Sequence, residues 1–268
     1  MKRAILLAEE RGASCWLTAW PRQDQGFNLH KGAFRDALAI RSGWELSQVP
    51  SLCVCGDTFT IDHAMICRHG GYPTLRHNGI RDLTASLLSE VCSDVQTEPS
   101  LQPVAGERLP PSSNKKDDAR LDIRARGFWC NDHQAAFFDV RVFHPNAALY
   151  RKSPIESVYR RHQFLKKQER GPRVTNIEQG CFTPLVLATT GGMGPEATIF
   201  YKRLASLLAT KRDTNYSVLM GWIRCRLSFA LLRSALLCIR GSRRLYTTVN
   251  TSDAADFVVS ASQLQLEE

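Results

Sequence analysis

The chain has 268 residues, 43% of them hydrophobic and 23% charged, which is enough to bury one full-sized core or two small ones. Its nine cysteines are scattered without an export signal, which argues against a secreted disulfide scaffold, and the longest apolar run, residues 227–239, contains Arg233 and is too short to span a bilayer. The cysteine pattern indicates an intracellular protein, and the formal charge of +9 favours a polyanionic partner such as DNA or RNA. We expect no membrane and no small-molecule substrate.

Helices are the first elements predicted in chain order. Apolar residues at helical spacing predict a short helix over residues 29–41, within a helical N-terminal segment of residues 1–50. A second helix is predicted over residues 76–91, where one apolar stripe is formed by Ile80, Leu83, Leu87, Leu88 and Val91. Such a stripe is typical of a helix that packs on a core.

Three cysteines and one histidine gather in residues 51–71. Cys53, Cys55, His63 and Cys67 offer three thiolates and one imidazole, a donor set that suits the tetrahedral coordination of zinc. A single residue separates Cys53 from Cys55, which is fewer than usual. Because the set fills all four positions, it predicts a structural zinc knuckle rather than a catalytic site. The alternative is a chance grouping of buried cysteines and a surface histidine.

Strands are predicted in the middle of the chain. Residues 119–129 alternate apolar and polar side chains, residues 135–143 are β-branched and aromatic, and the Asn131-Asp132 pair between them suits a hairpin. A basic helical pattern over residues 157–170, followed by an apolar run over 182–190, predicts a crossover to a parallel strand. The sequence therefore predicts an α/β fold with a small mixed sheet.

The C-terminal part is predicted to be helical. Helices are expected over residues 195–208 and 217–239, the second within a basic segment that covers residues 211–249. Residues 107–118 have the composition of an exposed loop, and residues 250–268 are expected to form a disordered tail. The sheet and its helices are expected to form one domain over residues 72–210.

Two aspartates lie within the apolar strands, where a carboxylate is costly without a partner or a metal. A two-residue turn at Asn131-Asp132 would place Asp122 opposite Arg141. The same register places Asp139 opposite Arg124, so that the two carboxylates become diagonal neighbours on one face and could hold a divalent cation. The alternative is that each aspartate forms an ordinary ion pair with one of these arginines.

The spacing of the two aspartates resembles that of the PD-(D/E)xK nucleases. In that class the carboxylates hold magnesium, the metal activates water and offsets charge on the phosphorane, and a lysine orients the nucleophile. Here Leu121 stands in place of the proline and Arg141 in place of the lysine, and arginine can clamp a phosphate but cannot act as a base. Lys166 and Lys167, on the following helix, are the candidates for a displaced lysine.

The order of these features resembles one family, the restriction-like endonuclease end of site-specific non-LTR retrotransposon polyproteins. In that family a Cys-Cys-His-Cys knuckle precedes an Arg-His-Asn helix, a Glu-Pro pair, two aspartate strands and a displaced lysine. Over residues 50–195 the chain has the knuckle followed by Arg76-His77-Asn78, Glu98-Pro99, Leu121-Asp122-Ile123, Asp139-Val140-Arg141-Val142 and Lys166-Lys167. The family also places a tyrosine after the lysines, whereas residues 169–172 read Glu-Arg-Gly-Pro here.

The resemblance implies a DNA nickase that exposes a 3′ hydroxyl, which the reverse transcriptase of the same polyprotein would extend on element RNA. The chain carries no polymerase motif, so the resemblance implies a truncated polyprotein. It also implies a restriction-endonuclease-like hairpin and crossover helix, structural zinc, catalytic magnesium, DNA and element RNA as partners, and a nuclear location.

The resemblance assigns roles to individual residues. We expect magnesium ligation by Asp122 and Asp139, a positioning cation from Lys166 or Lys167, and an additional acid from Glu98. Nucleic-acid contacts are expected from Arg76, His77, Arg141, Arg160 and Arg161. The alternatives are a catalytically inactive, zinc-stabilised remnant that binds nucleic acid, and a fragment that does not fold stably.

Overall fold

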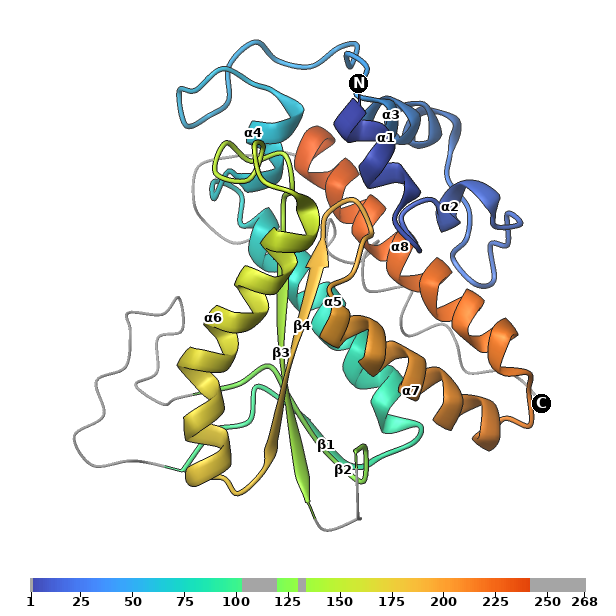
Figure 1. The fold of residues 1–268 in the computed structure, drawn as a ribbon. Coiled ribbons are helices and arrows are strands. Elements are labelled where there is room, and N and C mark those ends of the chain that lie inside the picture. The colour runs from blue at the N-terminus through green and yellow to red at the C-terminus, as the bar shows by residue number, and fades with distance from the viewer. Residues whose placement is uncertain (1, 103–119, 130–133, 242–268) are drawn as a thin grey trace.

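The chain folds around a four-stranded mixed sheet, in a computed structural model that describes residues 2–102, 120–129 and 134–241 (Figure 1). β1 pairs antiparallel with β2 and β2 antiparallel with β3, whereas β3 and β4 are parallel. The strands lie in the order β1 (Ser93–Thr97), β2 (Ile123–Arg126), β3 (Ala135–Phe143) and β4 (Cys181–Ala188). The predicted α/β class and mixed sheet are confirmed.

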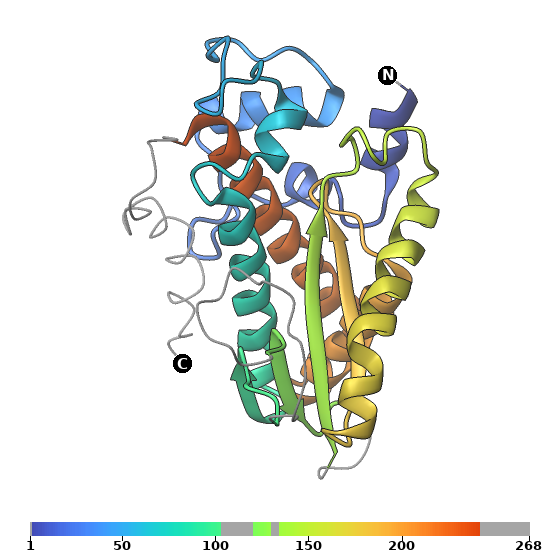
Figure 2. The ribbon, with the colours of Figure 1, turned by 90° about the vertical axis from the view of Figure 1, so that its left-hand side faces the viewer.

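Helices cover both faces of this sheet (Figure 2). Helix α6 (Ile155–Asn176) connects β3 to β4 across one face, as the predicted crossover requires. Helices α5 (Tyr72–Ser89), α7 (Pro195–Lys211) and α8 (Tyr216–Arg240) pack together on the other side. The main core lies there, because alternate side chains of β3 point toward these helices, and full burial of one such side chain, Phe138, contributes about 2 kcal/mol.

The register of the β2–β3 hairpin differs from the predicted one. Ile123 lies opposite Phe138 and Arg124 opposite Phe137, so the predicted pairing of Asp139 with Arg124 is wrong. The pairing is displaced by two residues, and its continuation past Ile123 sets Asp122 opposite Asp139. Because strand side chains alternate with a period of two, this displacement leaves both aspartates on the same face. The predicted turn at residues 131–132 lies outside the described residues.

The part of the chain before α5 packs along α8 and the end of the sheet (Figure 1). It contains α1 (Lys2–Glu9), α2 (Cys15–Thr18), α3 (Lys31–Ser42) and α4 (Ile61–Ile66). Trp16 packs in one buried cluster with Phe229 of α8, and Met65 of α4 packs in another with Cys238. Of the helices described, none is both long and apolar enough to cross a membrane. The predicted loop over residues 107–118 and the predicted tail over 250–268 lie outside the described residues.

An ion pair between Asp36 of α3 and Arg240 of α8 ties this segment to the C-terminal helix. Arg240 Nε and Nη2 lie 2.6 and 2.9 Å from the two carboxylate oxygens, and the Asp36 side chain is 5% exposed. The hydrogen bond from Arg240 holds the pKa of the Asp36 carboxyl below its usual value. The ionised carboxylate therefore stabilises the fold.

We expect Asp36→Asn to lower the free energy of unfolding by about 1–3 kcal/mol at neutral pH, because Arg240 loses its charged acceptor. A depressed pKa in the folded state means that this stabilisation is present above the pKa of the unfolded carboxyl and is lost as the pH falls through the folded one. Urea unfolding of wild type and variant at about pH 7 and about pH 3 should show a difference that shrinks in acid. An unchanged difference in acid would contradict the role of the Asp36 charge.

Candidate functional site

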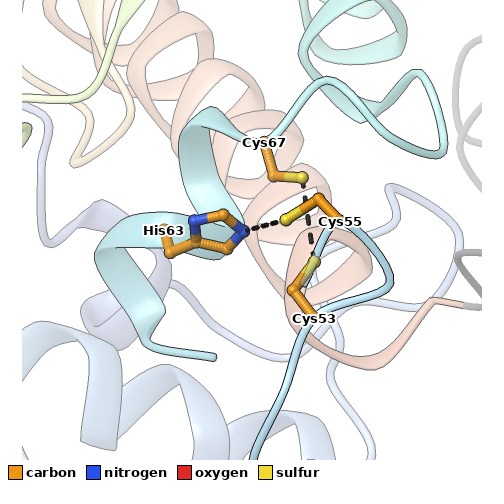
Figure 3. Close-up of side chains that lie close together, drawn as sticks. All are labelled: Cys53, Cys55, His63 and Cys67. Atoms are coloured by element: carbon orange, nitrogen blue, oxygen red, sulfur yellow. Dashed lines mark hydrogen bonds between the residues drawn. The ribbon is translucent and has the colours of Figure 1, made fainter. Parts of the chain in front are cut away.

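The predicted cluster of cysteines and histidine is formed in the structure (Figure 3). Cys53 and Cys55 lie in the loop before α4, His63 lies in α4, and Cys67 directly follows it. Cys53 Sγ is 3.7 Å from Cys67 Sγ, Cys55 Sγ is 3.2 Å from His63 Nε2, and the four donor atoms all lie within 4.8 Å of one another. Tetrahedral zinc separates its ligands by about 3.3–3.8 Å. The cluster can therefore hold a metal such as zinc.

The local sequence explains why these four side chains converge. Gly56 adopts φ of 93°, a left-handed conformation that other residues disfavour, and it turns the loop back after Cys55. Thr60 caps α4, since its side-chain oxygen accepts a hydrogen bond from the backbone N–H of His63 at 3.0 Å. This cap fixes the helical turn that presents His63 to the loop cysteines.

The thiols of the cluster differ in acidity. Burial opposes ionisation of Cys53, but hydrogen bonds from the Cys55 backbone and from His63 lower its pKa to about 6. The hydrogen bond from the Asp57 backbone lowers the pKa of Cys55, but burial and the neighbouring thiols raise it to about 11. Ionisation of one thiol thus opposes ionisation of the next, and a bound dication would remove that opposition.

Hydrogen bonds from both sides hold α4 in place. His144, which follows β3, lies with Nε2 2.9 Å from Asp62 Oδ1 and with Nδ1 2.8 Å from Thr189 Oγ1. Arg76 of α5 is 3% exposed and donates to the Met65 carbonyl at 3.0 Å. Burial contradicts the predicted nucleic-acid contact of Arg76, because its guanidinium is used inside the protein to join α5 to α4.

The two aspartates of the hairpin meet on the face covered by α6. Asp122 Oδ1 lies 3.0 Å from His77 Nε2, and its Oδ2 accepts from the backbone N–H of Val140 at 2.6 Å. Lys166 of α6 places Nζ 2.9 and 2.8 Å from the two oxygens of Asp139. The alternative of an ion pair between Asp139 and Arg124 is wrong, because Arg124 of β2 instead lies 3.1 Å from Asp94.

Burial and the interaction between the two carboxyls separate the pKa values of Asp122 and Asp139. Burial raises the pKa of Asp139 to about 6, with the Asp122 charge acting in the same direction and Lys166 against it. Burial also opposes ionisation of Asp122, but His77 and the Val140 N–H outweigh it and hold the pKa of that carboxyl below its usual value. Asp122 thus opposes ionisation of Asp139, whereas a hydrogen bond with Asp139 favours ionisation of Asp122, and a cation between the two would favour the ionised form of both.

The side chains of the other predicted catalytic residues are engaged elsewhere. Lys167 Nζ lies 2.5 Å from Glu196 Oε1 of α7, so of the two lysines it is Lys166 that contacts an aspartate. Glu98 donates its backbone N–H to the Asp122 carbonyl at 2.9 Å, but its carboxylate is bound by Arg81. Within the described ranges, the cysteine cluster is the one group of three or more acidic, cysteine or histidine ligand atoms as close as 4.8 Å.

A basic hollow of about 510 Å³ adjoins the acidic pair. Lys166 lines this hollow together with Arg141 of β3 and Arg161 of α6, both of which are exposed. Arg160, which precedes Arg161 in the chain, is also exposed. Burial, together with the charges of these neighbours, lowers the pKa of His162 in its wall to about 4, so this histidine is neutral at neutral pH. The predicted nucleic-acid contacts Arg141 and Arg161 therefore lie in one hollow with Lys166, which contacts Asp139.

Comparison with known proteins assigns no family. No protein-family model matches the chain, and no curated protein matches it in sequence.

Proposed function

We propose that this chain is a metal-dependent DNA endonuclease of the PD-(D/E)xK type. The single observation that carries the proposal is that Asp122 and Asp139 lie on one face of a mixed sheet with the ammonium group of Lys166 2.8 Å from the second carboxylate. A buried aspartate pair is costly for the fold, and a catalytic cation accounts for its presence.

Asp122 and Asp139 would hold magnesium between them, and the bound ion supplies an activated water and offsets charge on the phosphorane. Lys166 already lies at the Asp139 carboxylate and would donate to the nucleophile or to a phosphate oxygen. Arg141 and Arg161 would bind the flanking phosphates, since a guanidinium forms bidentate contacts with phosphate oxygens. The four Cys and His donors would hold zinc as a structural brace.

We further propose a retrotransposon origin, with the order of the knuckle, the Arg-His-Asn helix and the two aspartate strands as its support. On this proposal the cut is a nick in DNA that supplies a 3′ end for reverse transcription of element RNA. A reverse transcriptase would act with the chain, in the nucleus. The charge of +9 is compatible with both nucleic-acid partners.

The proposal is tested by incubating the purified chain with supercoiled plasmid and magnesium. We expect conversion to the open-circular form, blocked by chelation of magnesium. Lys166→Ala should slow nicking by about a hundredfold, which is typical for loss of one transition-state donor. Lys167→Ala is the matched control on the same helix and should nick nearly as the wild type, because its ammonium group contacts Glu196. Equal rates for both variants would contradict the assignment of Lys166.

A catalytically inactive nucleic-acid-binding protein is the second candidate. It is favoured by Arg141 in the position where the nuclease class has lysine, and by the direct neutralisation of Asp139 by Lys166. On this reading the chain binds DNA with an affinity that falls steeply with salt, and it does not cut. Binding without any magnesium-dependent nicking would select this candidate over the nuclease.

A further inference from the structure

His77 is the one predicted nucleic-acid contact whose side chain reaches the acidic pair. It projects from α5 with 31% of its side chain exposed, and its Nε2 lies 3.0 Å from Asp122 Oδ1. The other oxygen of the same carboxylate accepts from the Val140 N–H. Asp122 is thus held at both oxygens, once by a helix and once by the neighbouring strand, and it cannot rotate without breaking a hydrogen bond.

The helix that carries His77 is fixed on either side of it. One residue earlier, Arg76 is buried and donates to the Met65 carbonyl. Further along, Ile80 and Thr84 are fully buried, and the Thr84 hydroxyl lies 2.8 Å from that of Tyr201 in α7. The imidazole therefore reaches Asp122 from a rigid support, as a residue that orients another side chain requires.

His77 does not itself join the two carboxylates as a third ligand in this arrangement. In the part of the chain that the structure describes, Cys53, Cys55, His63 and Cys67 form a group of ligand atoms close enough to hold a metal ion, whereas His77 and the two aspartates do not. An imidazole that contacts one carboxylate and stays apart from the other acts on the first through a hydrogen bond. Such outer contacts set the direction in which a carboxylate offers its remaining lone pairs to a cation.

We propose that His77 is a positioning residue of the cation site: its Nε2–H donates to Asp122 Oδ1 and directs that carboxylate toward the ion shared with Asp139. The inference rests on the proposed nuclease function. It replaces the expectation that His77 binds nucleic acid directly. Loss of such an outer contact typically weakens metal binding or activity by about 10–100-fold.

The test measures Mn²⁺ binding to the zinc-loaded full chain by electron paramagnetic resonance, without DNA. We expect the wild type to bind Mn²⁺ at the pair, Asp122→Asn to lose that binding, and His77→Ala to weaken it by about 10–100-fold. His77→Gln is the matched variant, since its amide nitrogen can donate from nearly the same place, and it should retain most of the affinity.

Nicking assays and melting curves complete the test. If the residue positions Asp122, excess magnesium should restore most of the nicking rate of His77→Ala, while DNA affinity stays unchanged. The inference is overturned if His77→Ala binds Mn²⁺ as tightly as the wild type. It is also overturned if His77→Gln binds Mn²⁺ as weakly as His77→Ala while the two variants have the same melting temperature. Either result leaves the nuclease proposal intact. If the wild type binds no Mn²⁺ and Asp122→Asn nicks DNA as fast as the wild type, both the role of His77 and the nuclease proposal are overturned.

Discussion

Asparagine in place of Asp139 is expected to reduce magnesium-dependent nicking by about a thousandfold or more, because metal ligation contributes several kcal/mol to such a reaction. The amide is nearly isosteric with the carboxylate but carries no charge, so it cannot share a dication with Asp122. DNA binding should persist, since the exposed arginines Arg141 and Arg161 are untouched. Plasmid nicking and a salt-dependent binding assay measure the two effects separately.

Asp94→Asn is the matched control for this substitution. Asp94 lies in β1 of the same sheet, and its carboxylate pairs with Arg124 and Arg126 at 3.1 and 3.3 Å, away from the aspartate pair. It should nick DNA at close to the wild-type rate. Rapid nicking by Asp139→Asn, or an equal loss in Asp94→Asn, would remove the buried pair from the chemistry.

The same change at Asp139 is expected to stabilise the fold at neutral pH. Burial raises the pKa of Asp139 to about 6 in the folded chain, above an unfolded value of about 3.9. The folded state therefore favours the protonated acid, and stability falls as the pH rises from the unfolded pKa through the folded one.

Asp139→Asn removes that penalty, so its melting temperature at neutral pH should exceed that of the wild type by a few degrees, at roughly 2–4 °C for each kcal/mol. The difference should vanish at about pH 3 and below, under both pKa values, where both side chains are neutral in both states. A lower melting temperature at neutral pH would mean that the contact with Lys166 outweighs the burial of the charge. Gain of stability with loss of nicking is the combination that marks a functional group held at a cost to the fold.

The sheet and its crossover could be predicted because their signals are local. β3 is rich in aromatic and β-branched residues, and the alternation of its side chains fixes which of them share a face. That alternation explains why the faces of the two aspartates were predicted correctly although the register was not. A displacement by two residues changes the partner of each side chain and preserves its face.

The contacts between distant segments could not be predicted in the same way. Arg76 and His77 are adjacent in the sequence, yet one enters the interior toward α4 and the other reaches Asp122. The helical phase of α5 separates them, since adjacent residues lie on different sides of a helix. The cysteine cluster was found because its donors are close in sequence, whereas the link from Asp62 to His144 joins segments 82 residues apart and left no local signal.

Removal of the metal from the cysteine cluster is expected to lower the melting temperature by about 10 °C or more, since structural zinc contributes directly to folding free energy. The stability of the fold depends on the cluster because α4, which carries His63, packs against two core helices. Met65 is 1% exposed and packs with Tyr72 of α5 and Cys238 of α8, so loosening of α4 exposes the ends of two core helices. Melting curves with and without a zinc chelator, together with metal analysis by mass spectrometry, provide the measurement.

Cys53→Ser should reproduce the effect of the chelator and should show little further change when the chelator is added. Cys92→Ser is the control, because Cys92 is half-buried beside the main core and belongs to no ligand cluster in the described residues. It should keep its metal and lose stability on chelation as the wild type does. Hydrogen exchange should rise first in α4 and at the start of α5, whose Arg76 donates to the Met65 carbonyl, and last in β3. A wild-type chain that binds no zinc, or that melts at the same temperature with chelator, would reduce the cluster to a chance grouping of thiols.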